Sequence, residues 1–109
     1  MKDFMLCQGD TKRINYVLPL NLSQKKVFFV FGDHQGHSKK IKCVAQSALS
    51  QEYKSLSQGG ICIPFTAGDL EKSGLFSVQF LIIDMKGNQT TYPESGYLSM
   101  KIQGSLLGG

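Results

Sequence analysis

The fold class is decided by one stretch, Leu75-Phe76-Ser77-Val78-Gln79-Phe80-Leu81-Ile82-Ile83. Every second residue from Phe76 to Ile82 is apolar, and this two-residue period is that of a β-strand and not of a helix. Because Leu81 and Ile83 are apolar as well, we expect the second half of this strand to be covered on both faces, as a central strand is. The neighbours of this strand should be found among the other alternating segments.

Six further segments have the residue types of strands. Residues 26–31 are β-branched and aromatic, and the turn Gly32-Asp33-His34-Gln35-Gly36 behind them predicts a hairpin with the strand of Ile41 and Cys43. Lys40 and Lys42 alternate with these two residues, so they should lie on the outer face, where lysines discourage edge-to-edge pairing. The other strands are expected at residues 4–6, 14–18, 61–65 and 97–102.

Two segments break the strand alternation. In residues 66–74, Thr66 is placed to cap a helical turn, and Gly74 lies past its end. Asp69 and Glu71 fall in the first turn, where carboxylates stabilise the free amide groups, so we expect one short helical turn here. Residues 45–58 are rich in Ser and Gln with weak helical spacing, which fits either a short helix or a long loop, and we favour a mobile connection.

The order of these elements predicts an all-β fold. About seven short strands are separated by turns such as Gln8-Gly9-Asp10-Thr11 and Asp84-Met85-Lys86-Gly87-Asn88, which is typical of an antiparallel β-sandwich. Residues 1–109 should form a single domain, because two halves would be too small to build separate cores. The expected core consists of Phe29, Phe31, Phe76, Val78, Phe80, Leu98 and Met100.

Charge and hydropathy narrow the classes of partner. The formal charge is +4, but the 12 basic residues are scattered, and their densest group is Lys39, Lys40 and Lys42. We therefore expect no binding to nucleic acid. No stretch approaches the roughly 18 consecutive apolar residues that a membrane helix needs, and no signal peptide is visible, so we expect no membrane partner either.

The chain carries three cysteines, Cys7, Cys43 and Cys62. They lack C-x-x-C spacing and their number is odd, which predicts free thiols and synthesis in a reducing compartment. Cys43 and Cys62 could be nucleophiles, but both lie in expected strands with apolar neighbours. A cysteine in that setting acts as a small hydrophobic residue, and we interpret both as core.

The remaining candidate site residues have simpler structural explanations. His34 and His37 could share a metal ion with Asp33, but this ligand set is small and a solvated turn is the better interpretation. Asp69 and Glu71 could be imagined as an acid/base pair, but capping of the helical turn explains both.

Arg13 is the only arginine and fits either a plain surface position or an interface anchor. The sequence has no nucleophile elbow, Walker loop, dinucleotide-binding loop or zinc-protease motif. We therefore expect no catalytic, cofactor-binding or metal-binding residues, and no enzyme.

Several of these segments form an ordered set. They are Gln8-Gly9-Asp10-Thr11-Lys12, Ile61-Cys62-Ile63-Pro64-Phe65, Leu70, Ser73-Gly74-Leu75-Phe76, Phe80, Ile83-Asp84 and Lys86-Gly87. In order and spacing the set resembles the N-terminal domain of phage baseplate upper proteins, found in tailed phages and prophages of Gram-positive bacteria. The likeness covers nearly the whole chain. Two departures are a longer polar insert at residues 45–58 and an end at Gly109, where family members usually continue.

The resemblance implies an immunoglobulin-like sandwich that anchors a larger fibre or receptor-binding assembly to the tail tip. It implies a structural protein of the virion baseplate, made in the cytoplasm of the bacterial host, with other tail proteins as partners and no cofactor. We expect a homo-oligomer in the assembled particle, with cyclic symmetry because tail tips have rotational symmetry. The alternative is an extracellular immunoglobulin-like adhesion or carbohydrate-binding module, which a leader and exposed aromatic clusters would favour.

Overall fold

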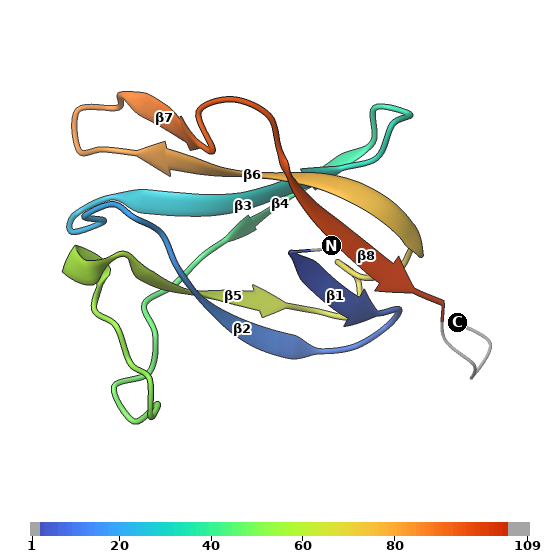
Figure 1. The fold of residues 1–109 in the computed structure, drawn as a ribbon, viewed down its shortest axis with the longest axis horizontal. Coiled ribbons are helices and arrows are strands. Elements are labelled where there is room, and N and C mark those ends of the chain that lie inside the picture. Colours follow the sequence, from blue (N-terminus) through green and yellow to red (C-terminus); the bar gives the residue numbers. More distant parts are fainter. Residues whose placement is uncertain (1–2, 105–109) are drawn as a thin grey trace.

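Eight β-strands and one 3-10 turn make up the regular structure of residues 3–104, the part of the chain that the computed structural model describes. None of these residues is in an α-helix. The elements are β1 (Phe4–Cys7), β2 (Lys12–Val17), β3 (Lys26–Gly32), β4 (Ser38–Lys42), η1 (Leu56–Gln58), β5 (Gly60–Phe65), β6 (Gly74–Ile83), β7 (Gln89–Tyr92) and β8 (Leu98–Gln103). Figure 1 shows their arrangement.

The strands form two sheets of unequal size. The larger sheet has the order β1-β8-β6-β3-β4, with β7 paired to the second half of β6, and the smaller sheet is the antiparallel pair β2-β5. β1 runs parallel to β8, so the larger sheet is mixed, and the expectation of a purely antiparallel fold is wrong. The reason is that the turn after β1 carries the chain into the other sheet, so β1 and β2 form no hairpin.

The seven expected strands are confirmed, and β7 is an eighth that the sequence reasoning missed. Its residues, Gln-Thr-Thr-Tyr, are mostly polar, and it pairs with only four residues of β6. The turn before it has the expected chemistry: Asp84 Oδ1 accepts hydrogen bonds from the backbone amides of Lys86 and Asn88, both at 2.9 Å. Gly87 takes the left-handed conformation, at φ +85°, that closes this hairpin.

Both sheets contribute to one core, which is centred on Phe29 of β3. The Phe29 ring contacts Phe4 from β1, Phe65 from β5 and Phe80 from β6, with ring centroids 5.2–5.5 Å apart. Because β5 belongs to the smaller sheet, these contacts join the two sheets face to face. Phe29, Phe65 and Phe80 are fully buried.

Most of the expected core is confirmed. Five of the seven residues are buried, whereas Phe76 and Leu98 are only partly buried and pack against the rim of the core. Leu81 and Ile83, on the outer face of β6, are half-buried, so that face is partly covered, as expected for the strand at the middle of the sheet.

In the two irregular segments, the short helical turn does not lie where it was expected. Residues 66–73 contain one hydrogen-bonded turn and a bend but no helical turn, and Gly74 already belongs to β6. The 3-10 turn lies instead at Leu56–Gln58, at the end of residues 45–58. Gln58 Oε1 caps the start of this turn by accepting a hydrogen bond from the Ser55 amide at 3.0 Å, and Gly59 ends the turn at φ +88°. The turn at Thr66 does not continue as a helix, because Leu70 is fully buried and the chain then enters β6.

Candidate functional site

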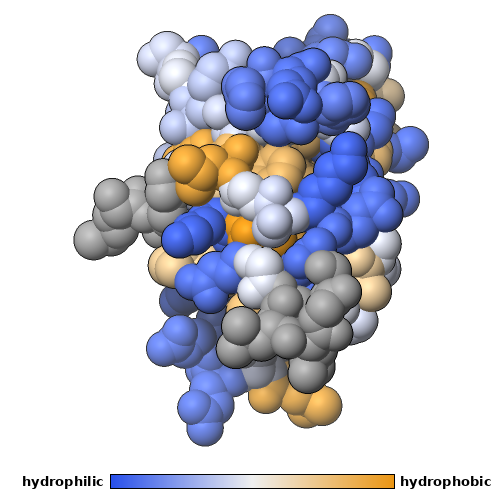
Figure 2. Space-filling model, turned by 90° about the vertical axis from the view of Figure 1, so that its right-hand side faces the viewer, coloured by the Kyte–Doolittle hydropathy of each residue, from blue (hydrophilic) through white to orange (hydrophobic). Residues whose placement is uncertain are grey.

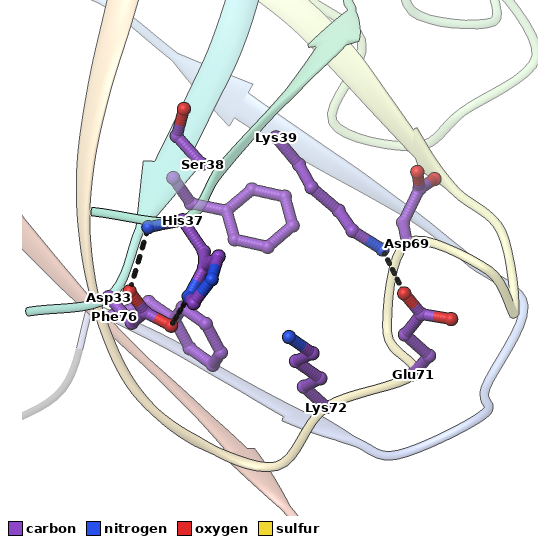
Figure 3. Close-up of a pocket in the computed structure, with 9 residues that line it drawn as sticks. Asp33, His37, Ser38, Lys39, Asp69, Glu71, Lys72 and Phe76 are labelled. Carbon is purple, nitrogen blue, oxygen red and sulfur yellow. Dashed lines mark hydrogen bonds and ion pairs between the residues drawn. The ribbon is translucent and has the colours of Figure 1, made fainter. Parts of the chain in front are cut away.

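A cleft opens at one end of the molecule, between the β3–β4 turn and the segment that leads from Asp69 into β6. Its deepest part is a cavity of about 240 Å³, drawn in Figure 3, and a shallower hollow of about 450 Å³ adjoins it. The two share Asp33, Glu71, Lys72 and Phe76. Concave surfaces with an apolar base and a few polar groups are the usual places for a bound ligand.

The floor of the cleft is aromatic. Phe31 of β3 and Phe76 of β6 meet edge to face, with ring centroids 5.6 Å apart and planes at 82°. Phe31 is buried and Phe76 is half-buried, so the pair is both the rim of the core and the base of the cavity. This edge-to-face geometry is favourable for aromatic pairs.

One wall is the β3–β4 turn, which Asp33 organises. Asp33 Oδ1 accepts hydrogen bonds from the amides of Gln35, at 2.9 Å, and His37, at 3.0 Å. Asp33 Oδ2 lies 3.2 Å from Nδ1 of the His37 ring. Partial burial alone would raise the pKa of Asp33, but these hydrogen bonds outweigh it and hold the pKa below its ordinary value. The carboxylate is therefore committed to shaping the turn.

The opposite wall is held by Lys39 of β4. Lys39 lies beside Phe31 in the strand register and shares the inward-facing side with Ile41, so its side chain reaches across the end of the core. Its Nζ donates to the carbonyl of Gly68 and lies 3.1 Å from Glu71 Oε1. Because both side chains are partly exposed, this ion pair contributes at most about 1 kcal/mol.

The Gln8-Gly9 turn braces the same wall from behind. The Gln8 side chain donates to the carbonyl of Glu71 at 2.7 Å, and the Gly9 amide donates to the carbonyl of Leu70 at 2.9 Å. Leu70 is fully buried beneath the wall. Two parts of the chain that are about sixty residues apart in sequence therefore fix the position of the cleft wall together.

Comparison with protein-family models and with curated protein sequences finds no match for this chain. The character of the molecular surface around the cleft is therefore the remaining evidence for where a partner binds. Figure 2 looks onto the end that lies at the right of Figure 1 and shows apolar surface bordered by hydrophilic groups. Leu75, which lines the shallower hollow, has 58% of its surface exposed.

The two histidines lie in an exposed turn, as expected from the sequence. His34 and His37 are both exposed, and His37 interacts with Asp33. Within residues 3–104, no three His, Cys, Asp or Glu side chains are grouped closely enough to hold a metal ion. The part of the chain with described coordinates also has no helix long and apolar enough to cross a membrane.

The cysteine interpretation is confirmed. All three cysteines are free thiols. Cys62 is buried in β5, Cys43 is buried directly after the end of β4, and Cys7 is exposed. Burial, reinforced by the neighbouring Cys62, raises the pKa of the Cys43 thiol to about 12. A thiol with so high a pKa is almost entirely protonated at neutral pH and is a poor nucleophile.

The two acidic residues of the 66–74 segment have different roles. Asp69 caps its turn as predicted, because Asp69 Oδ2 accepts hydrogen bonds from the Thr66 amide and hydroxyl, both at 2.8 Å. Glu71 caps nothing and pairs with Lys39 instead, so that part of the prediction is wrong. The hydrogen-bonded turn ends at Leu70 and does not continue as a helix. The Glu71 side chain therefore lies on the cleft wall.

The sequence reasoning missed the structural role of Gln46. This buried side chain donates to the carbonyls of Tyr16 and Ile61, each at 3.2 Å, and accepts from the Lys54 amide at 2.9 Å. It fastens residues 45–58 to the smaller sheet, although this segment was expected to be a mobile connection. A glutamine among serines gives no local signal of burial, since its partners are backbone groups from distant strands.

Proposed function

We propose that this chain is a docking module of a phage tail baseplate, which anchors a fibre or receptor-binding assembly to the tail tip. In this proposal the two sheets form an immunoglobulin-like sandwich, and other tail proteins bind its surface. The protein would be made in the bacterial cytoplasm and would reside in the virion. Its three free thiols fit synthesis in a reducing compartment.

The observation that carries the proposal is the position of the family-like residues. Gln8 and Gly9 hydrogen-bond to Glu71 and Leu70, so two separate pieces of the resembling set meet at the cleft wall. A third piece, Asp84 with Gly87, forms the β6–β7 turn. This meeting of separate pieces of the set supports the proposal, because the pieces hold neighbouring parts of the fold together.

We propose binding and not catalysis, because Asp33, Lys39 and Glu71 of the cleft are used to hold its walls. Asp33 is bound by the amides of its own turn and faces His37, and Lys39 is bound by Glu71. A general acid or base must be free to exchange a proton with a substrate. The aromatic base and polar walls are instead the composition of a site that receives a segment of a partner protein.

The proposal is tested by mixing the purified protein with the baseplate hub proteins of the phage or prophage that encodes it. Size-exclusion chromatography with light scattering should show co-elution with one of them. We expect Leu75→Lys to weaken this binding, because Leu75 is an exposed apolar residue at the mouth of the cleft.

The matched control is Met85→Lys. Met85 is also exposed and apolar, with 79% of its surface accessible, but it lies in the β6–β7 turn, beyond the other end of β6. A ten-residue strand separates the two sites by roughly 30 Å. Met85→Lys should leave binding unchanged.

Absence of co-elution with every tail protein would contradict the baseplate role. Saturable binding of a host glycan that Leu75→Lys abolishes would instead support the adhesion or carbohydrate-binding alternative. Equal effects of the two lysine substitutions would contradict the assignment of the cleft as the contact surface.

A further inference from the structure

Among residues 3–104, no strand pairs with the edge of β2 that faces away from β5. Leu18 donates its amide hydrogen to the carbonyl of Gly59, in the same register that pairs β2 with β5. Hydrogen-bonded pairs alternate along an antiparallel ladder, so the backbone groups of Arg13, Asn15 and Val17 point away from β5. Within residues 3–104, none of these three makes a backbone hydrogen bond elsewhere.

Two further contacts support this assignment of directions. Cys62 and Val44 exchange backbone hydrogen bonds at 2.7 and 2.9 Å, on the side of β5 that faces away from β2. Pro64, which has no amide hydrogen, stands opposite Arg13, a position where the ladder requires no donor.

We propose that two copies of this chain pair through β2, antiparallel and centred on Asn15, to form the continuous sheet β5-β2-β2-β5. In this register the three outward-pointing residues face the same three residues of the partner, and about six hydrogen bonds form. Asn15 faces its own equivalent, and Arg13 faces the partner's Val17. The result is a closed two-fold dimer, the commonest form of homo-oligomer.

Charge favours this register over its neighbours. Arg13 and the partner's Arg13 lie four residues apart along the paired strands, which is roughly 13 Å. That distance exceeds the screening length of about 8 Å at physiological ionic strength, so the two cations repel weakly. The aliphatic stem of Arg13 covers the partner's Val17, and Val17 has 49% of its surface exposed in the single chain.

The other long edge of the molecule is protected against the same pairing. On β4, Asp33 and His37 share one ladder hydrogen bond, and Cys43 and Val27 share another. This alternation directs the backbone of Lys40 outward. Pairing of two β4 strands about this residue would place Lys40 against its own equivalent, and lysines on an edge are a common protection against such contacts. On β2 the residue at the centre of the proposed pairing is Asn15, which is uncharged.

The inference is independent of the baseplate role, because it concerns the purified chain alone. Sedimentation equilibrium from about 10 µM to about 1 mM, a range suited to a small edge-to-edge contact, should show reversible dimers. Asn15→Pro should shift the dissociation constant at least tenfold, since it removes a central donor without touching the β2–β5 ladder. Lys40→Pro, the matched control, also replaces an outward-pointing amide and should leave the dimer intact.

A charge exchange tests the register itself. Val17→Arg would place two cations opposite each other and should abolish the dimer. Adding Arg13→Glu to Val17→Arg sets opposite charges face to face and should restore it. Circular dichroism of each variant verifies the fold, and the charge pair decides the question if Asn15→Pro does not fold. A chain that stays monomeric at about 1 mM, a dimer that only Lys40→Pro weakens, or failure of the double variant to re-form dimers would each overturn the proposal.

Discussion

Phe28 and Phe29 are adjacent residues of the same type on opposite faces of β3, and they provide a sharp test of the fold. Phe29 is fully buried, with four phenylalanine rings within 5.7 Å of its own ring. Phe28 is half-buried on the outer face, where the ammonium group of Lys40 lies 4.8 Å from its ring centre.

The expected losses of unfolding free energy differ accordingly. Truncation of a buried phenylalanine to alanine costs about 3–5 kcal/mol, and each ring pair adds about 0.5–1.5 kcal/mol without being additive. We therefore expect Phe29→Ala to cost about 5 kcal/mol. Phe28→Ala removes half-buried surface and a cation–π contact worth about 0.5–1 kcal/mol at such a site, so we expect a loss of about 1–2 kcal/mol.

Urea unfolding followed by circular dichroism measures both losses. With a slope of about 1–3 kcal/mol per molar urea, Phe29→Ala should lower the midpoint by about 2 M or more. Domains of this size have a total stability of about 5–15 kcal/mol, so Phe29→Ala could unfold the protein outright. Phe29→Leu, which retains most of the bulk, then supplies the measurement. Equal losses for the two positions, or a larger loss at Phe28, would refute the assignment of the inner face.

Three other predictions test local features. Gly59→Ala should lower the free energy of unfolding by at least about 3 kcal/mol, because the new Cβ would lie 1.8 Å from the Leu18 carbonyl oxygen and φ is +88°. Gly87→Ala, at φ +85° with open space around it, should lower it by about 1–2 kcal/mol in the same urea experiment. Asp33→Asn should destabilise the protein at pH 7, because the lowered pKa of Asp33 gives a stabilisation that is present above its ordinary pKa of about 3.9. This stabilisation is lost as the pH falls through the lowered pKa, so the two proteins should converge in strong acid, and a difference that grows with acidification would contradict the sign. Titration of thiols should find only Cys7 reactive in the native protein and three thiols after denaturation without reductant, whereas a single thiol after denaturation would indicate a disulfide.

Local alternation in the sequence determined most of the strands and their facing. In residues 75–83 the inward set is the one that the two-residue period selected, since successive side chains of a strand point to opposite faces whatever the partner strand is. The turn chemistry was equally local. Asp84 and Gly87 act within five residues of each other, and Thr66 and Asp69 within four.

The candidate site was only partly visible in the sequence. Asp33 and His37 lie close together along the chain, so the turn that they form could be expected. The pairing of Lys39 with Glu71 could not, because it joins residues about thirty positions apart. From the sequence, a lysine near a strand end, such as Lys39, is expected to be solvated. Lys39 pairs with Glu71 only because the 66–74 segment lies across the end of the core.

Only the tertiary structure decided how the strands are shared between the two sheets. The alternation of apolar and polar residues shows that a strand has an inner face. It does not show which other strand pairs with it through backbone hydrogen bonds. Phe4 stands beside Met100 in the parallel β1–β8 pair, and β7 is polar, so neither pairing leaves a local signal. The sequence by itself thus determined an all-β chain with a phenylalanine core, because side-chain alternation is local. The mixed sheet, the cleft at its end and the free edge of β2 come from long-range pairing, in which distant segments compete for the same backbone partners.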